Sequence, residues 1–225
     1  MISIKEYDQA AYDMRRSGTE RADGNLDGRE LIRYATLAAS SHNTQPWKFR
    51  IRKDRITILP DFSRRCPVVD PDDSHLFKSL GCAAENMIHA AAAQGFLAEI
   101  QFNPAENSVD VLLSRDATAC ATELYRAITK RQCVKTAYDG RPVSETELEK
   151  LQKAGKGKSV RTILLTSTAD KNTVTDFVTR GNIAQLTDRA FRKELINWIR
   201  FNPAEAMRKG DGLAGRTSGQ PGWRK

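Results

Sequence analysis

Apolar side chains recur at helical spacing in three stretches of the first half of the chain. Residues 5–16 and 26–39 each place apolar side chains on one face, which predicts two amphipathic helices. A third stretch, residues 72–94, is rich in alanine and other small residues, and Asp72 or Asp73 can cap its start. Small residues let neighbouring elements approach closely, so we expect this long helix to lie at the buried centre of the fold.

Apolar and polar residues alternate in the segments between these helices, as is typical of half-buried strands. Residues 47–52 and 55–60 flank a short turn, which predicts a hairpin. Two further strands, residues 98–102 and 109–113, follow the long helix. This order of helices and hairpins indicates an α+β fold with a mostly antiparallel sheet flanked by helices around a long central helix.

The second half of the chain is mainly helical in its pattern. Ser144 and Glu147 make a capping-box sequence ahead of a helix that ends near Ala154. Residues 160–166 predict an apolar strand. The helices expected after this strand cover residues 170–180, 183–191 and 194–200.

Composition narrows the class of protein. The chain has 225 residues, of which 40% are hydrophobic and 28% are charged, as in soluble globular domains. No apolar run is long enough to cross a bilayer, and the N-terminus lacks the apolar segment of an export signal. We therefore expect a cytoplasmic protein that does not bind membranes.

Charge and cysteine spacing argue against two kinds of binding site. The net charge is +8, but the sequence has no helix-turn-helix pattern, no aromatic-basic strand motif and no zinc knuckle. We expect no nucleic-acid partner, since a surface that attracts phosphate-bearing cofactors explains the charge as well. The cysteines, Cys66, Cys82, Cys120 and Cys133, are widely scattered, so we expect free thiols and no metal site.

A polar cluster stands between the second predicted helix and the first predicted strand. Seven of its eight residues carry a polar group, and the cluster reads Ser40-Ser41-His42-Asn43-Thr44-Gln45-Pro46-Trp47. Many hydrogen-bonding groups on a fixed frame suit a polar, planar ligand. The alternative is an ordinary polar loop in which Asn43 and Gln45 cap their own backbone.

The same residues carry a family resemblance. With Ala38 and Ala39 before it, the cluster resembles the helix-to-strand signature of the nitroreductase superfamily of FMN enzymes, although the family has proline at the position of Ala39. His42 is similar to the residue found in the Acg-like branch. A Gly81-Cys82-Ala83 run that leads to Asn86 on the long helix also matches the family. The resemblance implies a nitroreductase-like fold and an FMN site at Ser40, Ser41, His42, Asn43 and Gln45.

A second segment resembles the arm that holds the FMN phosphate and ribityl chain in the family. It covers residues 124–143, and its matching positions are Lys130, Arg131, Gln132, Cys133 and Lys135. Positive charge is retained at three of them. Cys133 stands where the family has a hydroxyl, and Lys135 replaces an arginine, which removes bidentate hydrogen bonding to phosphate.

The arm-like segment implies a tandem of two nitroreductase-like units. The resemblance assigns residues 1–117 to a first repeat and residues 118–205 to a partial second repeat, followed by a disordered tail over residues 206–225. Residues 210–213 resemble a family segment that normally leads into more of the second unit. The second repeat is therefore expected to be C-terminally truncated, with an exposed apolar face that either destabilises the chain or is covered in a homodimer.

The resemblance implies an FMN-dependent oxidoreductase. NAD(P)H would be a transient electron donor, and quinone-like or nitroaromatic small molecules the acceptors, by hydride transfer through the flavin. Flavin chemistry needs little from side chains, so no catalytic acid or base is assigned. Two alternatives stay open: a protein that stores or shields FMN without turnover, and a truncated paralogue without function.

Overall fold

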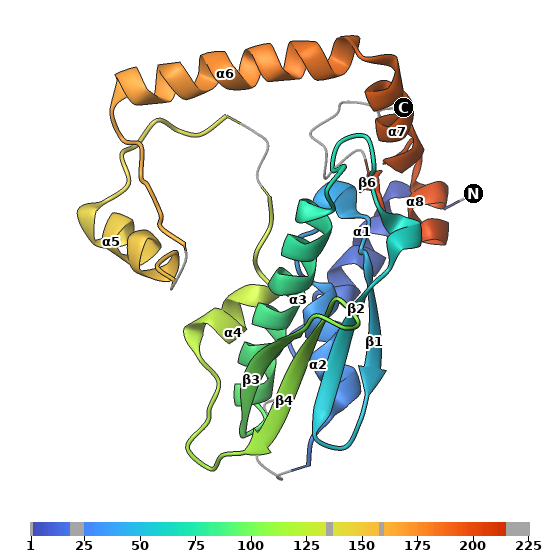
Figure 1. Cartoon of the computed structure of the whole chain (residues 1–225), viewed down its shortest axis with the longest axis vertical. Helices are drawn as coiled ribbons and strands as arrows, with labels where there is room; N and C mark the ends of the chain where they lie inside the picture. The colour runs from blue at the N-terminus through green and yellow to red at the C-terminus, as the bar shows by residue number, and fades with distance from the viewer. Residues whose placement is uncertain (1, 19–24, 134–136, 158–159, 215–225) are drawn as a thin grey trace. The chain divides into compact units, whose positions relative to one another are not determined.

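The chain forms two compact units. The computed structural model describes residues 2–18, 25–133, 137–157 and 160–214. The first unit joins the N-terminal region of the chain, which ends at residue 134, to a C-terminal region that starts at Glu194, and the second unit is the stretch between them. Figure 1 follows the chain through both units by colour.

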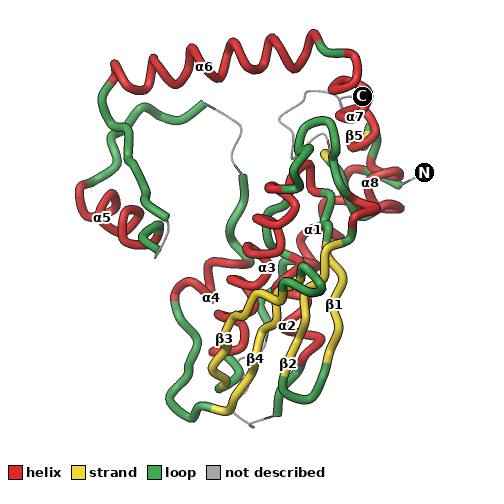
Figure 2. The backbone as a smooth tube through the Cα atoms, viewed as in Figure 1, coloured by secondary structure: helices red, strands yellow, loops and turns green. Residues whose placement is uncertain are grey.

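The first unit contains a four-stranded sheet with the order β1-β2-β4-β3 (Figure 2). The strands are β1 (Trp47–Ile51), β2 (Arg55–Pro60), β3 (Phe96–Asn103) and β4 (Ser108–Arg115). Each neighbouring pair is antiparallel, and Trp47 pairs with Pro60 at the open end of the first hairpin. The predicted antiparallel sheet and both hairpins are confirmed.

Four helices accompany this sheet: α1 (Ile4–Met14), α2 (Gly28–Thr36), α3 (Ser74–Ala92) and α4 (Glu123–Ile128). Helix α1 begins with a capping box between Ser3 and Glu6. The Asp27 side chain caps α2 by accepting from the backbone N–H groups of Arg29 and Glu30. The first three helices match those predicted from apolar spacing.

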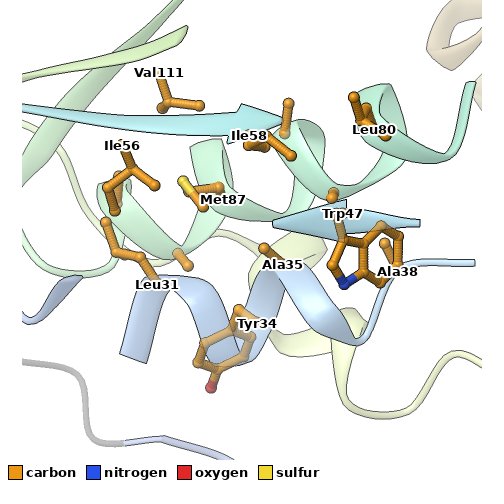
Figure 3. Packing of buried hydrophobic residues seen from close by; sticks show 14 of the residues in the cluster. Leu31, Tyr34, Ala35, Ala38, Trp47, Ile56, Ile58, Leu80, Met87 and Val111 are labelled. Carbon is orange, nitrogen blue, oxygen red and sulfur yellow. The ribbon is translucent and has the colours of Figure 1, made fainter. Parts of the chain in front are cut away.

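The core lies between the sheet and the pair of helices α2 and α3 (Figure 3). Leu31 of α2 and Met87 of α3 meet Ile56 and Ile58 of the sheet, and all four are fully buried. The small residues of α3 include Ala83, which is also fully buried. The prediction that the alanine-rich helix is the buried centre of this unit is therefore confirmed.

The start of α3 is capped mainly by Asp70, which the sequence did not single out, while the predicted Asp72 accepts from the Ser74 N–H at 3.3 Å. The Asp70 carboxylate accepts from the backbone N–H groups of His75 at 2.9 and 3.0 Å and of Leu76 at 3.0 Å. Asp73, at the N-cap position itself, is left-handed and makes no capping bond. The preceding turn, closed by a bond from the Asp70 N–H to the Cys66 carbonyl at 2.8 Å, brings Asp70 over the helix end.

The second unit contains α5 (Glu145–Ala154), α6 (Thr168–Thr187) and the first turn of α7 (Arg189–Trp198). The predicted capping box at Ser144 and Glu147 is confirmed. The strand predicted over residues 160–166 is wrong, because no strand is described within this unit for it to pair with, and Ile163 is 75% exposed. The two helices predicted over residues 170–180 and 183–191 are mostly a single helix, since α6 continues through Gly181.

The C-terminal region of the first unit adds α8 (Pro203–Lys209) and a parallel pair of two-residue strands, β5 (Ile199–Arg200) and β6 (Leu213–Ala214). The disordered tail expected from residue 206 is therefore wrong for residues 206–214. The Asn202 side chain caps α8 by accepting from the Glu205 N–H at 2.9 Å. Residues 215–225 lie outside the described residues.

No helix among the described residues is long and apolar enough to cross a membrane.

We expect Ile58→Ala to lower the free energy of unfolding by about 2–5 kcal/mol, because it opens a cavity at a fully buried position. Ile51→Ala is the matched control on the neighbouring strand, where the side chain is 49% exposed, and should cost less than about 1 kcal/mol. Urea unfolding monitored by circular dichroism measures both. Equal losses of unfolding free energy in the two variants would contradict the burial of Ile58 in the core.

Candidate functional site

The polar cluster forms a strained loop between α2 and β1, which we call the signature loop (residues 40–46). Residues 41–43 make one short 3₁₀ turn. His42, Asn43 and Gln45 have positive φ angles of 49°, 53° and 53°. Non-glycine residues in this region are disfavoured and persist only where the surroundings hold them. The loop is therefore a candidate functional element.

Backbone bonds and one serine organise the inside of the signature loop. Ser40 Oγ accepts from the Gln45 N–H at 3.0 Å. The Asn43 N–H donates to the Ser40 carbonyl at 3.0 Å, and the Thr44 N–H donates to the Ser41 carbonyl at 2.9 Å. Ser40 thus has the structural role expected of an ordinary polar loop.

The amides of Asn43 and Gln45 reach a distant stretch of the chain, residues 210–212, which we call the C-terminal segment. Asn43 Nδ2 donates to the Gly212 carbonyl at 3.0 Å, and the Gly212 N–H donates to the Asn43 carbonyl at 3.0 Å. Gln45 Nε2 donates to the Gly210 carbonyl at 2.6 Å. The polar-loop alternative required these two amides to cap their own backbone. Their described bonds instead reach the C-terminal segment.

A charged cluster fixes the C-terminal segment beside the loop. Arg200 donates from Nε and Nη2 to Asp211 Oδ1 at 3.0 and 2.6 Å. Arg64 binds the other carboxylate oxygen of Asp211 through Nη2, and its Nε donates to the Thr44 carbonyl at 2.5 Å. The Arg200 side chain is only 3% exposed and that of Asp211 is 11% exposed. A charged group so far from water needs a partner of opposite charge, and Arg200 and Asp211 are such partners for each other.

His42 lies against a buried thiol. Its Nδ1 is 3.8 Å from Cys66 Sγ. Burial, with a smaller contribution from the carboxylates of Glu194 and Asp70, raises the pKa of the Cys66 thiol to about 12. Because the thiolate is the reactive form, Cys66 is not arranged as a nucleophile at neutral pH. Among the described residues, no group of three or more His, Cys, Asp or Glu side chains is placed to hold a metal ion.

The arm-like residues start close to the signature loop. Tyr125 of α4 receives a hydrogen bond from the Tyr34 hydroxyl of α2 at 2.8 Å, and the two rings are 4.9 Å apart between centroids. Three residues after α4, Arg131 donates from Nη2 to the Leu37 carbonyl at 3.1 Å, at the end of the helix that leads into the loop. The structure therefore brings Arg131 to the loop end of α2.

The other arm residues show fewer contacts. Lys130, Gln132 and Cys133 are exposed, and Cys133 Sγ accepts from Arg131 Nη1 at 3.6 Å. Lys135 lies outside the described residues. The structure thus places four of the five arm positions and gives Arg131 alone a described contact with α2.

Asn86, which matched the family on the long helix, binds within the protein. Its Nδ2 donates to the Tyr34 carbonyl at 3.0 Å, which ties α3 to α2. The half-buried Asn86 amide therefore has a structural contact within the protein.

Sequence reasoning missed the residues that hold the loop from outside: Arg64, Arg200, Asp211 and Gly212. Residues 210–212 fall within the tail expected to be disordered, although residues 210–213 also resemble a family segment. The available signal was the pair of glycines around an aspartate, a pattern typical of a tight turn. Nothing in the sequence points to its partners, because Asn43 and Gly212 are 169 residues apart.

Several polar groups of the site could hold a cofactor. An amide side chain has two N–H donors and one acceptor, and each of the Asn43 and Gln45 amides uses one N–H in the described contacts. The other polar groups available to a ligand are the two amide oxygens, the Ser41 hydroxyl and the exposed cations of Lys130 and Arg131. These donors and acceptors fit a planar heterocycle that carries a phosphate.

We expect a thiol reagent at pH 8 to label Cys82, Cys120 and Cys133, which are exposed, and to spare the buried Cys66 until the protein unfolds. With a pKa of about 12, Cys66 stays protonated well above pH 8. Mass spectrometry of the labelled peptides checks this. Labelling of Cys66 at the rate of the other three would contradict the described burial.

Comparison with known proteins gives a distant but specific similarity. No family model matches the chain. The chain is 26% identical over 181 residues to proteins from two strains of Mycobacterium tuberculosis, each named "Putative NAD(P)H nitroreductase". The aligned region covers 76% of this chain and 50% of each relative, so the chain spans about half the length of these proteins. This similarity supports a place for the chain in the nitroreductase superfamily.

Proposed function

We propose that this protein is an FMN-dependent NAD(P)H oxidoreductase of the nitroreductase type. Its acceptors would be small quinone-like or nitroaromatic molecules. The observation that carries the proposal is the strained signature loop, in which His42, Asn43 and Gln45 are held with positive φ. The distant similarity to proteins named as NAD(P)H nitroreductases supports the same reaction class.

The amides of the signature loop suit the ring of a flavin. One edge of the isoalloxazine alternates carbonyl oxygens with ring nitrogens, so it needs both donors and acceptors in one plane. Asn43 and Gln45 each offer both kinds of group. The groups are also pre-oriented, because the C-terminal segment fixes one N–H of each amide. Pre-orientation lowers the entropy lost when a ligand binds.

The cations at the end of α4 suit the phosphate. Arg131 is exposed, and two of its five N–H donors are used in the described contacts with Leu37 and Cys133. Lys130 adds a neighbouring positive charge. Hydrogen bonds between a guanidinium and a phosphate are charge-assisted and stronger than neutral ones. Gln132, Cys133 and Lys135 would line the rest of this site.

The chain contributes binding and orientation to the proposed reaction. When bound, FMN supplies the transfer of hydride or electrons between NAD(P)H and the acceptor. Asn43 and Gln45 would hold the ring, and Arg131 would hold the phosphate end. The thiol of Cys66 stays protonated behind His42 and does not transfer protons at neutral pH.

A second candidate function is FMN storage or shielding without turnover. The observation that favours it is the position of the C-terminal segment, which already binds the Asn43 and Gln45 amides. A segment at this place could cover one side of a bound flavin and keep NAD(P)H away.

A homodimer would cover apolar side chains that are exposed within the second unit, such as Phe177 and Ile183 of α6.

We expect the purified chain to take up FMN with a visible spectrum shifted from that of free FMN. Anaerobic addition of NADH or NADPH should then bleach the flavin band, because the ring accepts the hydride. A bound flavin that neither nicotinamide reduces would support storage instead of turnover. A protein that takes up no FMN would contradict both functions.

We expect Arg131→Ala to weaken FMN binding by about 10-fold or more, the cost of a lost charge-assisted hydrogen bond. Riboflavin, which lacks the phosphate, should bind with an affinity changed by less than about 2-fold. Fluorescence titration measures both ligands. Arg50→Ala is the control, since Arg50 pairs with Glu106 on the exposed sheet surface. Equal weakening for FMN and riboflavin would reject the phosphate role of Arg131.

A further inference from the structure

Every residue from Asn43 to Gln45 is bonded from outside the signature loop. The Asn43 amide and backbone pair with Gly212, and the Gln45 amide bonds the Gly210 carbonyl. The Thr44 carbonyl, in a residue that is 2% exposed, accepts from Arg64 Nε. All these bonds lead either into the C-terminal segment or to the arginine that binds it.

Asp211 joins these contacts into one unit. One of its carboxylate oxygens accepts from Nε and Nη2 of Arg200, and the other is bound by Arg64. Arg64 thereby connects the Asp211 carboxylate directly to the Thr44 carbonyl. Arg200 is itself fixed, because Nη1 donates to the Asn197 carbonyl at 2.8 Å. The carboxylate therefore lies between a rigid anchor and the loop.

The loop needs such support from outside. Its positive φ angles at His42, Asn43 and Gln45 are disfavoured by steric contact between Cβ and the backbone, least so at Asn43. Ser40 and the backbone turn bind the loop internally, but they do not fix the direction of the Asn43 and Gln45 side chains. Those directions are set by the carbonyls of Gly212 and Gly210.

Close packing at Gly212 makes the arrangement specific. Gly212 has a φ of 77°, and a Cβ placed there would lie 2.5 Å from the Trp198 carbonyl oxygen and 2.8 Å from the Arg200 guanidinium. Gly210 also has a positive φ, 65°, but a Cβ there would meet nothing within 4 Å. Position 212 therefore requires glycine for two reasons, its positive φ and the lack of space for a Cβ, whereas position 210 has only the first.

We propose that Asp211 is a positioning residue, which holds the signature loop in the conformation that binds the ligand. It acts through Arg64 on Thr44 and, through the C-terminal segment, on the Asn43 and Gln45 amides. The positioning of the loop follows from the contacts alone. Its effect on FMN affinity rests on the proposed function.

The first test uses the ligand-free protein. Asp211→Asn keeps the shape of the side chain and removes its charge, and Gly212→Ala introduces the steric clash. Both should speed hydrogen exchange of the backbone amides of Asn43, Thr44 and Gln45 by about 10-fold or more, with the exchange of Met87 in α3 unchanged. Gly140→Ala and Glu106→Gln are the controls, one for a positive-φ glycine outside the C-terminal segment and one for an ion pair. They should leave the loop amides as in the wild type.

Equal exchange of the loop amides in wild type, Asp211→Asn and Gly212→Ala would overturn the proposal, whatever the protein binds. Faster exchange at Met87 as well, in both variants, would also overturn it, because the segment would then support the whole fold. This test does not depend on FMN. It therefore separates failure of the positioning role from failure of the proposed function.

The second test asks whether Asp211 acts through the loop. FMN affinity is measured for Asp211→Asn, Asn43→Ala and the double variant. Each single change should weaken binding by about 10-fold, and the double variant should be weakened by clearly less than the product of the two effects, because loss of the oriented Asn43 amide is common to both. A double variant weakened by about 100-fold would show independent effects and would contradict positioning. If the wild type binds no FMN, the proposed function fails and the exchange test still decides the role of Asp211.

Discussion

The candidate site depends on the pairing of the buried Arg200 guanidinium with the Asp211 carboxylate. Arg200 is almost completely removed from water, and an unpaired charge there would be strongly destabilising. Pairing with Asp211 satisfies it and, in the same contact, brings the C-terminal segment against the signature loop. The bond from Arg64 to Asp211 extends the cluster to the Thr44 carbonyl. One buried ion pair thus connects the end of the described chain to a loop near its start.

The core of helices and sheet supplies the frame for this contact. Helices α2 and α3 pack on the sheet through Leu31, Met87 and Ile58, and this packing fixes both ends of the signature loop. The Tyr34–Tyr125 pair attaches α4 to α2, so Arg131 lies near the end of α2 as well. Three segments that are far apart in the sequence therefore meet around one loop. This convergence places two amide side chains and a guanidinium close to one loop.

Local patterns were sufficient to predict much of the fold. Apolar spacing indicated α2 and the alanine-rich α3, and alternation indicated the two hairpins, because burial on one face decides both patterns. The pattern failed at residues 160–166, where an apolar run has no described strand beside it, and at Gly181, where one glycine does not break α6. The loop residues were recognised from a family resemblance. Their partners, Arg64 and Asp211, could not be recognised from the sequence, because ion pairs between distant residues leave no periodic signal in one sequence. The division into residues 1–117 and 118–205 stays a prediction, since compact units describe packing and not repeats.

The most direct test of the account is an NMR titration of the isotope-labelled chain with FMN. The account predicts that backbone and side-chain amide signals shift together in the signature loop, the C-terminal segment and residues 130–133, with the strands β3 and β4 unaffected. Shifts confined to the basic residues of the arm would show a phosphate contact without a flavin site at the loop. The absence of any shift in the Asn43 and Gln45 side-chain amides at saturating FMN would contradict the central claim.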